Sequence, residues 1–118
     1  MGRILVIDDD ADVRTMIERV LTRAGHNVAV AMDGLEGASR HHREAADLVI
    51  TDLYMPGQDG IEILTQFRKV SPHVPMIAIS GNSDMLIVAQ KLGAVATLKK
   101  PFAADQLLMA VKEALRQS

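Results

Sequence analysis

Short apolar runs alternate with helical patterns of apolar residues five times along this chain of 118 residues. A short apolar run bounded by polar residues is typical of a strand buried on both faces, and apolar residues spaced three and four apart predict an amphipathic helix. The runs predict strands over residues 4–7, 28–32, 48–51, 76–79 and 96–98. The helical patterns cover residues 13–24, with Asp12 as the expected N-cap, and residues 35–42, 61–70, 85–92 and 104–116. Such alternation favours an α/β fold in which helices cover both faces of a parallel sheet.

Polar side chains stand directly after four of the expected strands. Asp8 and Asp9 follow the first strand, Asp52 the third, Ser80 the fourth and Lys100 the fifth. The carboxyl ends of parallel strands share one edge of a sheet, so these side chains are expected to lie together. If the first and third strands share a site, they are neighbours at the sheet centre. Three carboxylates repel one another and need a cation, and Mg²⁺ fits because it takes one or two carboxylates and leaves room for a phosphate.

These residue types in this pattern indicate phosphoryl chemistry. A carboxylate can act as a nucleophile and form an aspartyl phosphate, so Asp52 is the candidate acceptor. Lys100 can balance charge and hold a phosphoryl oxygen, and the Ser80 hydroxyl can donate a hydrogen bond to another. Taken singly, residues 8–10 could form a solvated acidic turn and residues 99–100 a surface pair. Their joint placement favours a shared site.

Four motifs in a fixed order extend this interpretation. They are Ile-Leu-Val-Ile-Asp-Asp-Asp at residues 4–10, Asp-Leu-Tyr-Met-Pro-Gly-Gln-Asp-Gly at residues 52–60, Ile-Ser-Gly at residues 79–81 and Lys-Pro-Phe at residues 100–102. With them the whole chain resembles the receiver domain of bacterial two-component response regulators, of the single-domain, chemotaxis-regulator-like kind. The resemblance implies one receiver domain over residues 1–118. It also implies a flavodoxin-like, doubly wound five-stranded parallel sheet of order 2-1-3-4-5 with five helices.

The resemblance assigns a role to each residue of the expected site. Asp52 is implied as the phosphoacceptor. The implied Mg²⁺ ligands are Asp9 directly, Asp8 through water, Asp52 and the backbone carbonyl of Tyr54. Ser80 and Lys100 are implied to bind the phosphoryl group.

Two further positions matter to the resemblance. The peptide bond between Lys100 and Pro101 is expected to be cis. Thr97 stands where many relatives carry Tyr or Phe, so the aromatic part of the usual activation switch is missing.

The implied partners are proteins. A phosphohistidine on a sensor kinase or phosphotransfer protein is expected to donate the phosphoryl group and to dock near the start of the first helix. The candidate contacts there are Arg14, Thr15, Glu18, Arg19 and Thr22, although a solvated helix face explains them equally well. A downstream protein partner is expected, and the surface over residues 85–92, 96–98 and 104–116 is a candidate dimer face. The domain is not expected to act as an enzyme on a separate substrate. We expect it to catalyse only its own phosphorylation and its own slow dephosphorylation. The alternative is a Mg²⁺-dependent phosphohydrolase with an aspartyl-phosphate intermediate.

Composition excludes several other classes. A net charge of −2 offers no electrostatic argument for nucleic acid, and the absence of cysteine excludes disulfides and thiolate metal sites. No apolar run approaches the ~20 residues of a membrane span, so a soluble cytoplasmic protein is expected. The sequence shows no output domain after the last helix, which fits either a stand-alone receiver or one cut from a longer regulator. The four histidines are expected at the surface.

Overall fold

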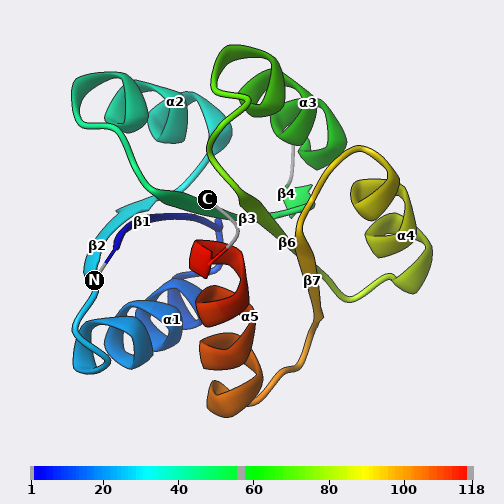
Figure 1. The fold of residues 1–118 in the computed structure, drawn as a ribbon. Coiled ribbons are helices and arrows are strands. Elements are labelled where there is room, and N and C mark those ends of the chain that lie inside the picture. Colours follow the sequence, from blue (N-terminus) through cyan, green and yellow to red (C-terminus); the bar gives the residue numbers. More distant parts are fainter. Residues whose placement is uncertain (1, 56–57, 117–118) are drawn as a thin grey trace.

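A five-stranded parallel sheet with the order β2-β1-β3-β6-β7 runs through the middle of the molecule (Figure 1). Its strands are β1 (Arg3–Ile7), β2 (Asn27–Ala31), β3 (Leu48–Asp52), β6 (Met76–Ser80) and β7 (Ala96–Lys99). The computed structural model describes residues 2–55 and 58–116. Counting the strands of this sheet alone, the order is 2-1-3-4-5, so the flavodoxin-like topology is confirmed. The expected central pairing of β1 with β3 is also present.

Helices cover both faces of the sheet. α1 (Ala11–Arg23) and α5 (Ala104–Arg116) lie on one face, and α2 (Gly34–Arg43), α3 (Gly60–Val70) and α4 (Ser83–Lys91) lie on the other (Figure 1). Successive strand residues point to opposite faces, so each face has its own apolar core. Ile4 and Val6 of β1 pack in the core of α1 and α5, whereas Leu5 and Ile7 pack in the other core. No helix in the described ranges is long and apolar enough to cross a membrane.

Four of the described helices have an Asp or Asn residue as their N-cap. These N-caps are Asp10, Asp33, Asp59 and Asn82. Each accepts hydrogen bonds from backbone N–H groups of the first turn, which have no partner inside the helix. The expectation that Asp12 caps α1 is wrong. Asp10 has extended backbone angles, and its Oδ1 accepts from the N–H groups of Asp12 and Val13 at 2.9 and 3.3 Å, so Asp12 lies within the first turn.

A short antiparallel pair, β4 (Tyr54–Met55) and β5 (Gln58–Asp59), follows β3 where the sequence predicted only a turn. The predicted turn residues Pro56 and Gly57 lie outside the described residues. The pair sets Tyr54 opposite Asp59, the N-cap of α3. Gly60 allows the chain to return so closely, because a Cβ atom there would overlap the backbone of Leu53.

Two of the four histidines are half-buried, although the sequence predicted all four at the surface. His41 is half-buried, and its Nδ1 accepts from the Ala46 N–H group at 3.0 Å while its Nε2 lies 3.0 Å from Ser71 Oγ. Burial lowers the pKa of His41. His26 is also half-buried and accepts from the Gly2 N–H group. Each ring has a partner in a distant segment, Ser71 for His41 and Gly2 for His26, which general surface preference cannot predict.

Gly37 brings α2 close to the sheet. It is buried, and a Cβ atom at this position would lie 2.5 Å from Ile7 Cδ1. Carbon atoms in contact are optimally about 3.5–4.0 Å apart, so no larger residue fits without movement. The glycine costs about 1 kcal/mol of helix propensity relative to alanine. Glycine is therefore required at position 37 by the close packing of α2 against β1, and not by the helix itself.

We expect Gly37→Ala to lower the free energy of unfolding by about 1–3 kcal/mol, despite the better helix propensity of alanine, because the methyl group overlaps Ile7. Urea denaturation measures this. Adding Ile7→Val, which removes Cδ1, should recover part of the loss. The exposed Ser39→Ala on the same helix is the control and should change stability by less than about 0.5 kcal/mol. A more stable Gly37→Ala protein would contradict the close packing.

Candidate functional site

The ends of β1 and β3 and the residue that follows β7 bring three carboxylates and an ammonium group together. Ligand oxygens of Asp8, Asp9 and Asp52 all lie within 4.8 Å of one another. Lys100 Nζ lies 2.9 Å from Asp52 Oδ2 and 3.1 Å from Asp8 Oδ2. Four of the side chains singled out in the sequence therefore meet at one place, which we call the acidic cluster.

Asp52 is held in one orientation by contacts to both carboxylate oxygens. It is only 4 % exposed, its Oδ1 accepts from the Tyr54 N–H group at 3.1 Å, and its Oδ2 faces Lys100. Tyr54 contributes its backbone here, because its side chain is 75 % exposed. β4 thus positions the carboxylate through a main-chain hydrogen bond and leaves the phenol in solvent.

Asp8 is fully buried, and one of its oxygens lacks a hydrogen bond. Oδ1 accepts from the Asp10 N–H group at 3.0 Å. Oδ2 accepts no hydrogen bond from the described residues, although the Lys100 ammonium group pairs with it electrostatically. Burial raises the pKa of Asp8 to about 6; the Asp52 charge adds to the rise, whereas the Asp10 hydrogen bond and the Lys100 charge oppose it. A nearby cation would stabilise the charged form of this carboxylate.

Lys100 carries the positive charge of the cluster. Burial acts to lower the pKa of Lys100, but its contacts with Asp52 and Asp8 outweigh burial and raise that pKa. The ammonium group therefore stays charged at neutral pH. Its peptide bond to Pro101 is cis, as expected from the resemblance. The Lys100 N–H group also donates to the Ser80 carbonyl oxygen at 3.0 Å, which ties the loop after β7 to β6.

Ser80 and Thr97 lie on the two strands beyond β3. Ser80 ends β6 and is buried, and its Oγ accepts from the Asn82 N–H group at 3.0 Å. Since Asn82 is the N-cap of α4, this hydroxyl is linked directly to the start of that helix. Thr97 is half-buried, pairs with Ala78 across the sheet, and lies two residues before the end of β7.

Arg14 has a structural role that the sequence did not predict. Its guanidinium group donates to the carbonyl oxygen of Asp8 at 2.8 Å and so fixes the end of β1. The sequence made Arg14 a candidate contact for a partner; in the structure it is half-buried and bonds the end of β1. A basic residue one turn into a helix that follows an acidic strand end is the signal that could have indicated this contact.

The donors of the acidic cluster fit a hard divalent cation. All are carboxylate oxygens, their combined charge exceeds that of the paired ammonium group, and Asp8 Oδ2 is buried without a hydrogen bond. Hard cations such as Mg²⁺ prefer oxygen ligands of this kind. The acidic cluster can therefore bind a metal ion.

Known proteins share this fold and sequence pattern. The model of the response regulator receiver domain family matches residues 4–112. The chain is 33 % identical over 115 residues to sporulation initiation phosphotransferase F of Bacillus subtilis, a match that covers 96 % of this chain and 93 % of that protein. It is 36 % identical over 117 residues to the transcriptional regulatory protein PrrA of Mycobacterium tuberculosis, but spans 50 % of that protein's length while 98 % of this chain is covered.

Solved structures agree. The receiver domain of NtrX from Brucella abortus superposes with a TM-score of 0.94 at 33 % identity, over 98 % of this chain and 99 % of that one. The chemotaxis protein CheY4 of Vibrio cholerae superposes with a TM-score of 0.88 at 27 % identity, over 97 % and 98 %. This chain belongs to the response regulator receiver domain family. It is a phosphoacceptor signalling domain of a two-component system, and nothing in the fold or the relatives favours the phosphohydrolase alternative.

Without divalent cations, we expect Asp8→Asn to raise the free energy of unfolding at pH 7–8 by about 1–3 kcal/mol. The folded-state pKa of about 6 lies above the unfolded value of 3.8, so the folded state binds more protons between those values. The wild-type protein must therefore lose stability as the pH rises through that window, and the substitution removes this loss.

Urea denaturation in EDTA from about pH 4 to pH 8 measures both effects. Glu18→Gln, an exposed change on α1, is the matched control and should follow the wild-type profile. If the stability of Asp8→Asn had the same pH profile as that of the wild-type protein, burial of the charged Asp8 would not be destabilising.

Proposed function

We propose that residues 1–118 form one receiver domain in which Asp52 accepts a phosphoryl group from a phosphohistidine and thereby changes the contacts of the domain with a protein partner. The observation that carries this proposal is the bridge from Lys100 to Asp52 and Asp8, with Asp9 beside them at the carboxyl edge of the sheet. The family match over residues 4–112 supports it.

In this proposal an Asp52 carboxylate oxygen attacks the phosphorus atom, a P–O bond forms, and the P–N bond to the histidine breaks. Lys100 and the Ser80 hydroxyl hold phosphoryl oxygens. Held by Asp8, Asp9, Asp52 and the Tyr54 carbonyl, Mg²⁺ would neutralise charge on the phosphoryl group. The domain turns over no separate substrate and catalyses only its own phosphorylation and slow dephosphorylation.

The phosphoryl donor would dock at the start of α1. Thr15, Glu18, Arg19 and Thr22 are exposed on this helix and remain candidate contacts, whereas Arg14 is engaged with Asp8. A sensor histidine kinase or a histidine phosphotransfer protein in the cytoplasm provides the required phosphohistidine. A relative matched over 93 % of its length is named a phosphotransferase, which supports a place in a phosphoryl relay.

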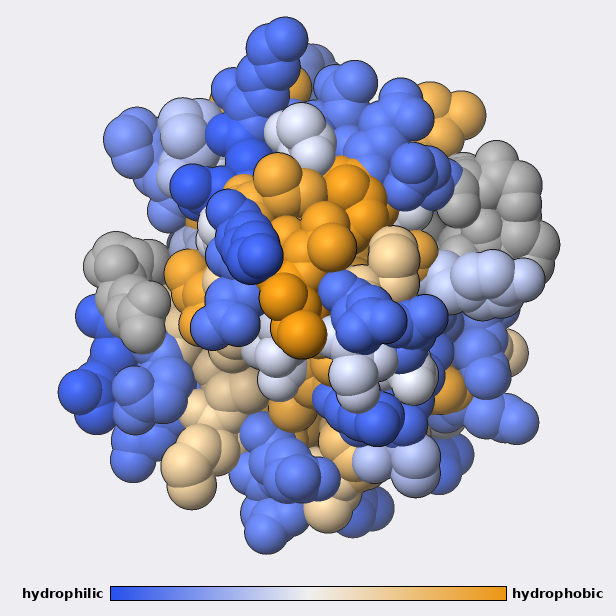
Figure 2. Space-filling model, turned by 90° about the vertical axis from the view of Figure 1, so that its right-hand side faces the viewer, coloured by the Kyte–Doolittle hydropathy of each residue, from blue (hydrophilic) through white to orange (hydrophobic). Residues whose placement is uncertain are grey.

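The downstream partner would bind over α4 and its neighbours. Figure 2 shows apolar side chains gathered at the centre of the face that lies over α4. Ile87, Val88, Leu92 and Val95 are exposed there. Contiguous apolar surface of this kind often marks a protein interaction site. The face formed by α4, β7 and α5 is accordingly the proposed output surface, for a partner or for a second copy.

Asp52→Asn should abolish phosphorylation by acetyl phosphate, because its amide cannot act as the nucleophile. Asp9→Asn should still accept the group but need about 10–100-fold more Mg²⁺. Mass spectrometry of the intact protein, with and without Mg²⁺, measures both. The exposed Asp105→Asn is the control and should be labelled like the wild type. Labelling of Asp52→Asn would remove Asp52 as acceptor, and repeated release of phosphate from a phosphomonoester would favour the hydrolase.

In this proposal phosphorylation affects α4 through Ser80. The Ser80 hydroxyl can donate to a phosphoryl oxygen while its Oγ accepts from the Asn82 N–H group, so a shift of this side chain toward the phosphoryl group would pull on the N-cap of α4. Thr97 is too small to fill space opened by a shift of Ser80. A ligand shifts an equilibrium only by its differential interaction with the two states. We therefore expect the Ser80 loop to respond strongly and β7 to respond weakly.

Thr97→Tyr should enlarge the response of β7 and α5 to phosphorylation, while Thr97→Ala should change little. Ser80→Ala should lose the response of the loop around Gly81 and Asn82 yet still bind the phosphoryl mimic beryllofluoride. Amide NMR shifts with and without that mimic measure each response. Wild-type shifts that are largest at Thr97 with a quiet Ser80 loop would contradict this account of the switch.

A further inference from the structure

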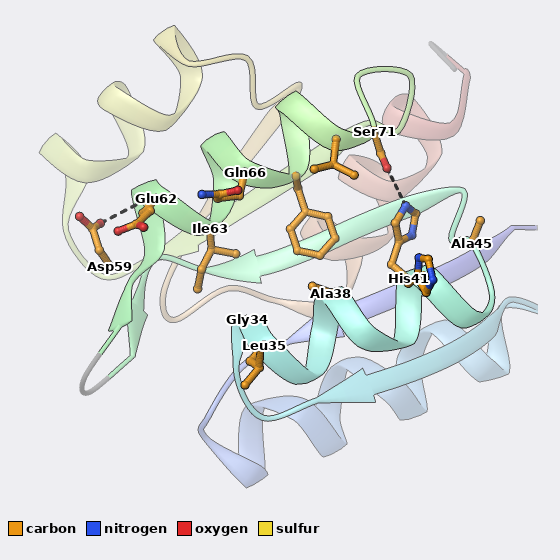
Figure 3. A pocket seen from close by; sticks show the side chains of 13 residues that line it. Gly34, Leu35, Ala38, His41, Ala45, Asp59, Glu62, Ile63, Gln66 and Ser71 are labelled. Atoms are coloured by element: carbon orange, nitrogen blue, oxygen red, sulfur yellow. Dashed lines mark hydrogen bonds between the residues drawn. The ribbon is translucent and has the colours of Figure 1, made fainter.

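An apolar groove of about 740 Å³ runs between α2 and α3 (Figure 3), and its lining includes no residue of the acidic cluster or of α4. Its floor and walls include Ala38, Ile63 and Phe67. At the rims, Leu35 is 80 % exposed and Val70 is 76 % exposed. Two large apolar side chains so exposed beside an apolar groove point to a surface that is covered by another molecule.

The two ends of the groove differ in chemistry. Leu35, Asp59 and Glu62 lie toward one end, and His41, Ala45 and Ser71 lie toward the other (Figure 3). The first end therefore offers carboxylates, and the second end offers the exposed imidazole ring of His42, since both ring nitrogens of His41 already have partners in Ala46 and Ser71. Val70 directly precedes Ser71 at the second end. Each end thus combines one exposed apolar side chain with polar groups that complement those of the opposite end.

We propose that the groove binds a second copy of this chain in an antiparallel, two-fold arrangement. In such an interface each residue contacts the partner's opposite end, so the surface must complement itself after rotation. The arrangement sets Leu35 of one copy against the Val70 end of the other. It also sets Asp59 and Glu62 against an imidazole N–H group of the partner's His42. Both contacts occur twice.

This complementarity favours a second copy over an unrelated helix. A foreign amphipathic helix would need only the apolar floor, and it would leave the protruding Leu35 and Val70 at opposite ends unexplained. The antiparallel pair uses both protrusions, because each lies over the partner's groove. Self-association through this face requires no phosphorylation and leaves the α4 surface and the start of α1 open.

Sedimentation equilibrium from about 10 µM to about 1 mM protein, unphosphorylated and without Mg²⁺, tests the proposal. We expect the wild-type chain to dimerise, and Leu35→Glu and Val70→Glu each to weaken the dimer at least about tenfold. Ala38→Trp, which fills the groove without a charge, should act likewise. Met109→Glu, an equally drastic change at an exposed site on α5, is the control and should leave the dimer intact. Circular dichroism checks that each variant folds.

A charge pair tests the geometry. Leu35→Glu and Val70→Lys should each be monomeric alone, because a charge faces an apolar side chain at both contacts. Mixed, they should form a heterodimer, because one contact becomes Glu against Lys and the other remains Val against Leu. Failure of the mixture to associate would overturn the antiparallel arrangement.

Other outcomes overturn the proposal. A wild-type chain that stays monomeric up to about 1 mM has no such interface. A dimer that survives Leu35→Glu and Val70→Glu but dissociates in Ile87→Glu forms through the α4 surface. Neither result bears on phosphorylation of Asp52, so this test and that of the proposed function fail separately.

Discussion

Three carboxylates lie close together at the carboxyl edge of the sheet, and the contacts around them offset the repulsion between their negative charges. Asp8 and Asp52 are buried beside Asp9, and Lys100 pairs with both buried carboxylates. The loops after β1, β3 and β6 share one hydrogen-bond pattern. In each, a site side chain accepts a hydrogen bond from the N–H group two residues later. The pairs are Asp8 with Asp10, Asp52 with Tyr54 and Ser80 with Asn82. The groups that carry the chemistry therefore also shape their own loops.

The sequence predicts the sheet, the helices and the meeting of the acidic cluster, because each depends on local patterns joined by one rule about parallel strands. What it misses depends on partners distant in sequence. His41 lies 3.0 Å from the Ser71 hydroxyl on another segment, and Gly37 is required because Ile7 lies beneath it. Neither partner can be deduced from spacing. The N-cap of α1 was misplaced for another reason: several aspartates in a row offer equivalent caps, and the backbone angles of Asp10 decide between them.

The two proposed interaction surfaces begin at helix caps that adjoin the site loops. Asn82 caps α4 and bonds Ser80, so the α4 surface lies one loop from the phosphoryl position. Asp59 caps α3 and pairs with Tyr54, whose N–H group holds Asp52, so the groove between α2 and α3 also begins close to the site. The links differ in kind. The Ser80 hydroxyl still has its own proton to donate to a phosphoryl oxygen, whereas the only proton of the Tyr54 N–H group is already donated to Asp52. We therefore expect the α4 surface to be the responsive one.

Burial also determines the side from which the site can be reached. Asp8 is fully buried and Asp52 nearly so, and Lys100 covers the oxygens that they turn toward β7. Asp9 is exposed and directly precedes the cap of α1. A phosphohistidine that delivers its phosphoryl group to Asp52 must then approach over Asp9, which brings its protein against the first turns of α1. In the proposed function, the exposed side chains of that helix would become contacts by geometry, whatever their charge, and their identities would decide which donor fits.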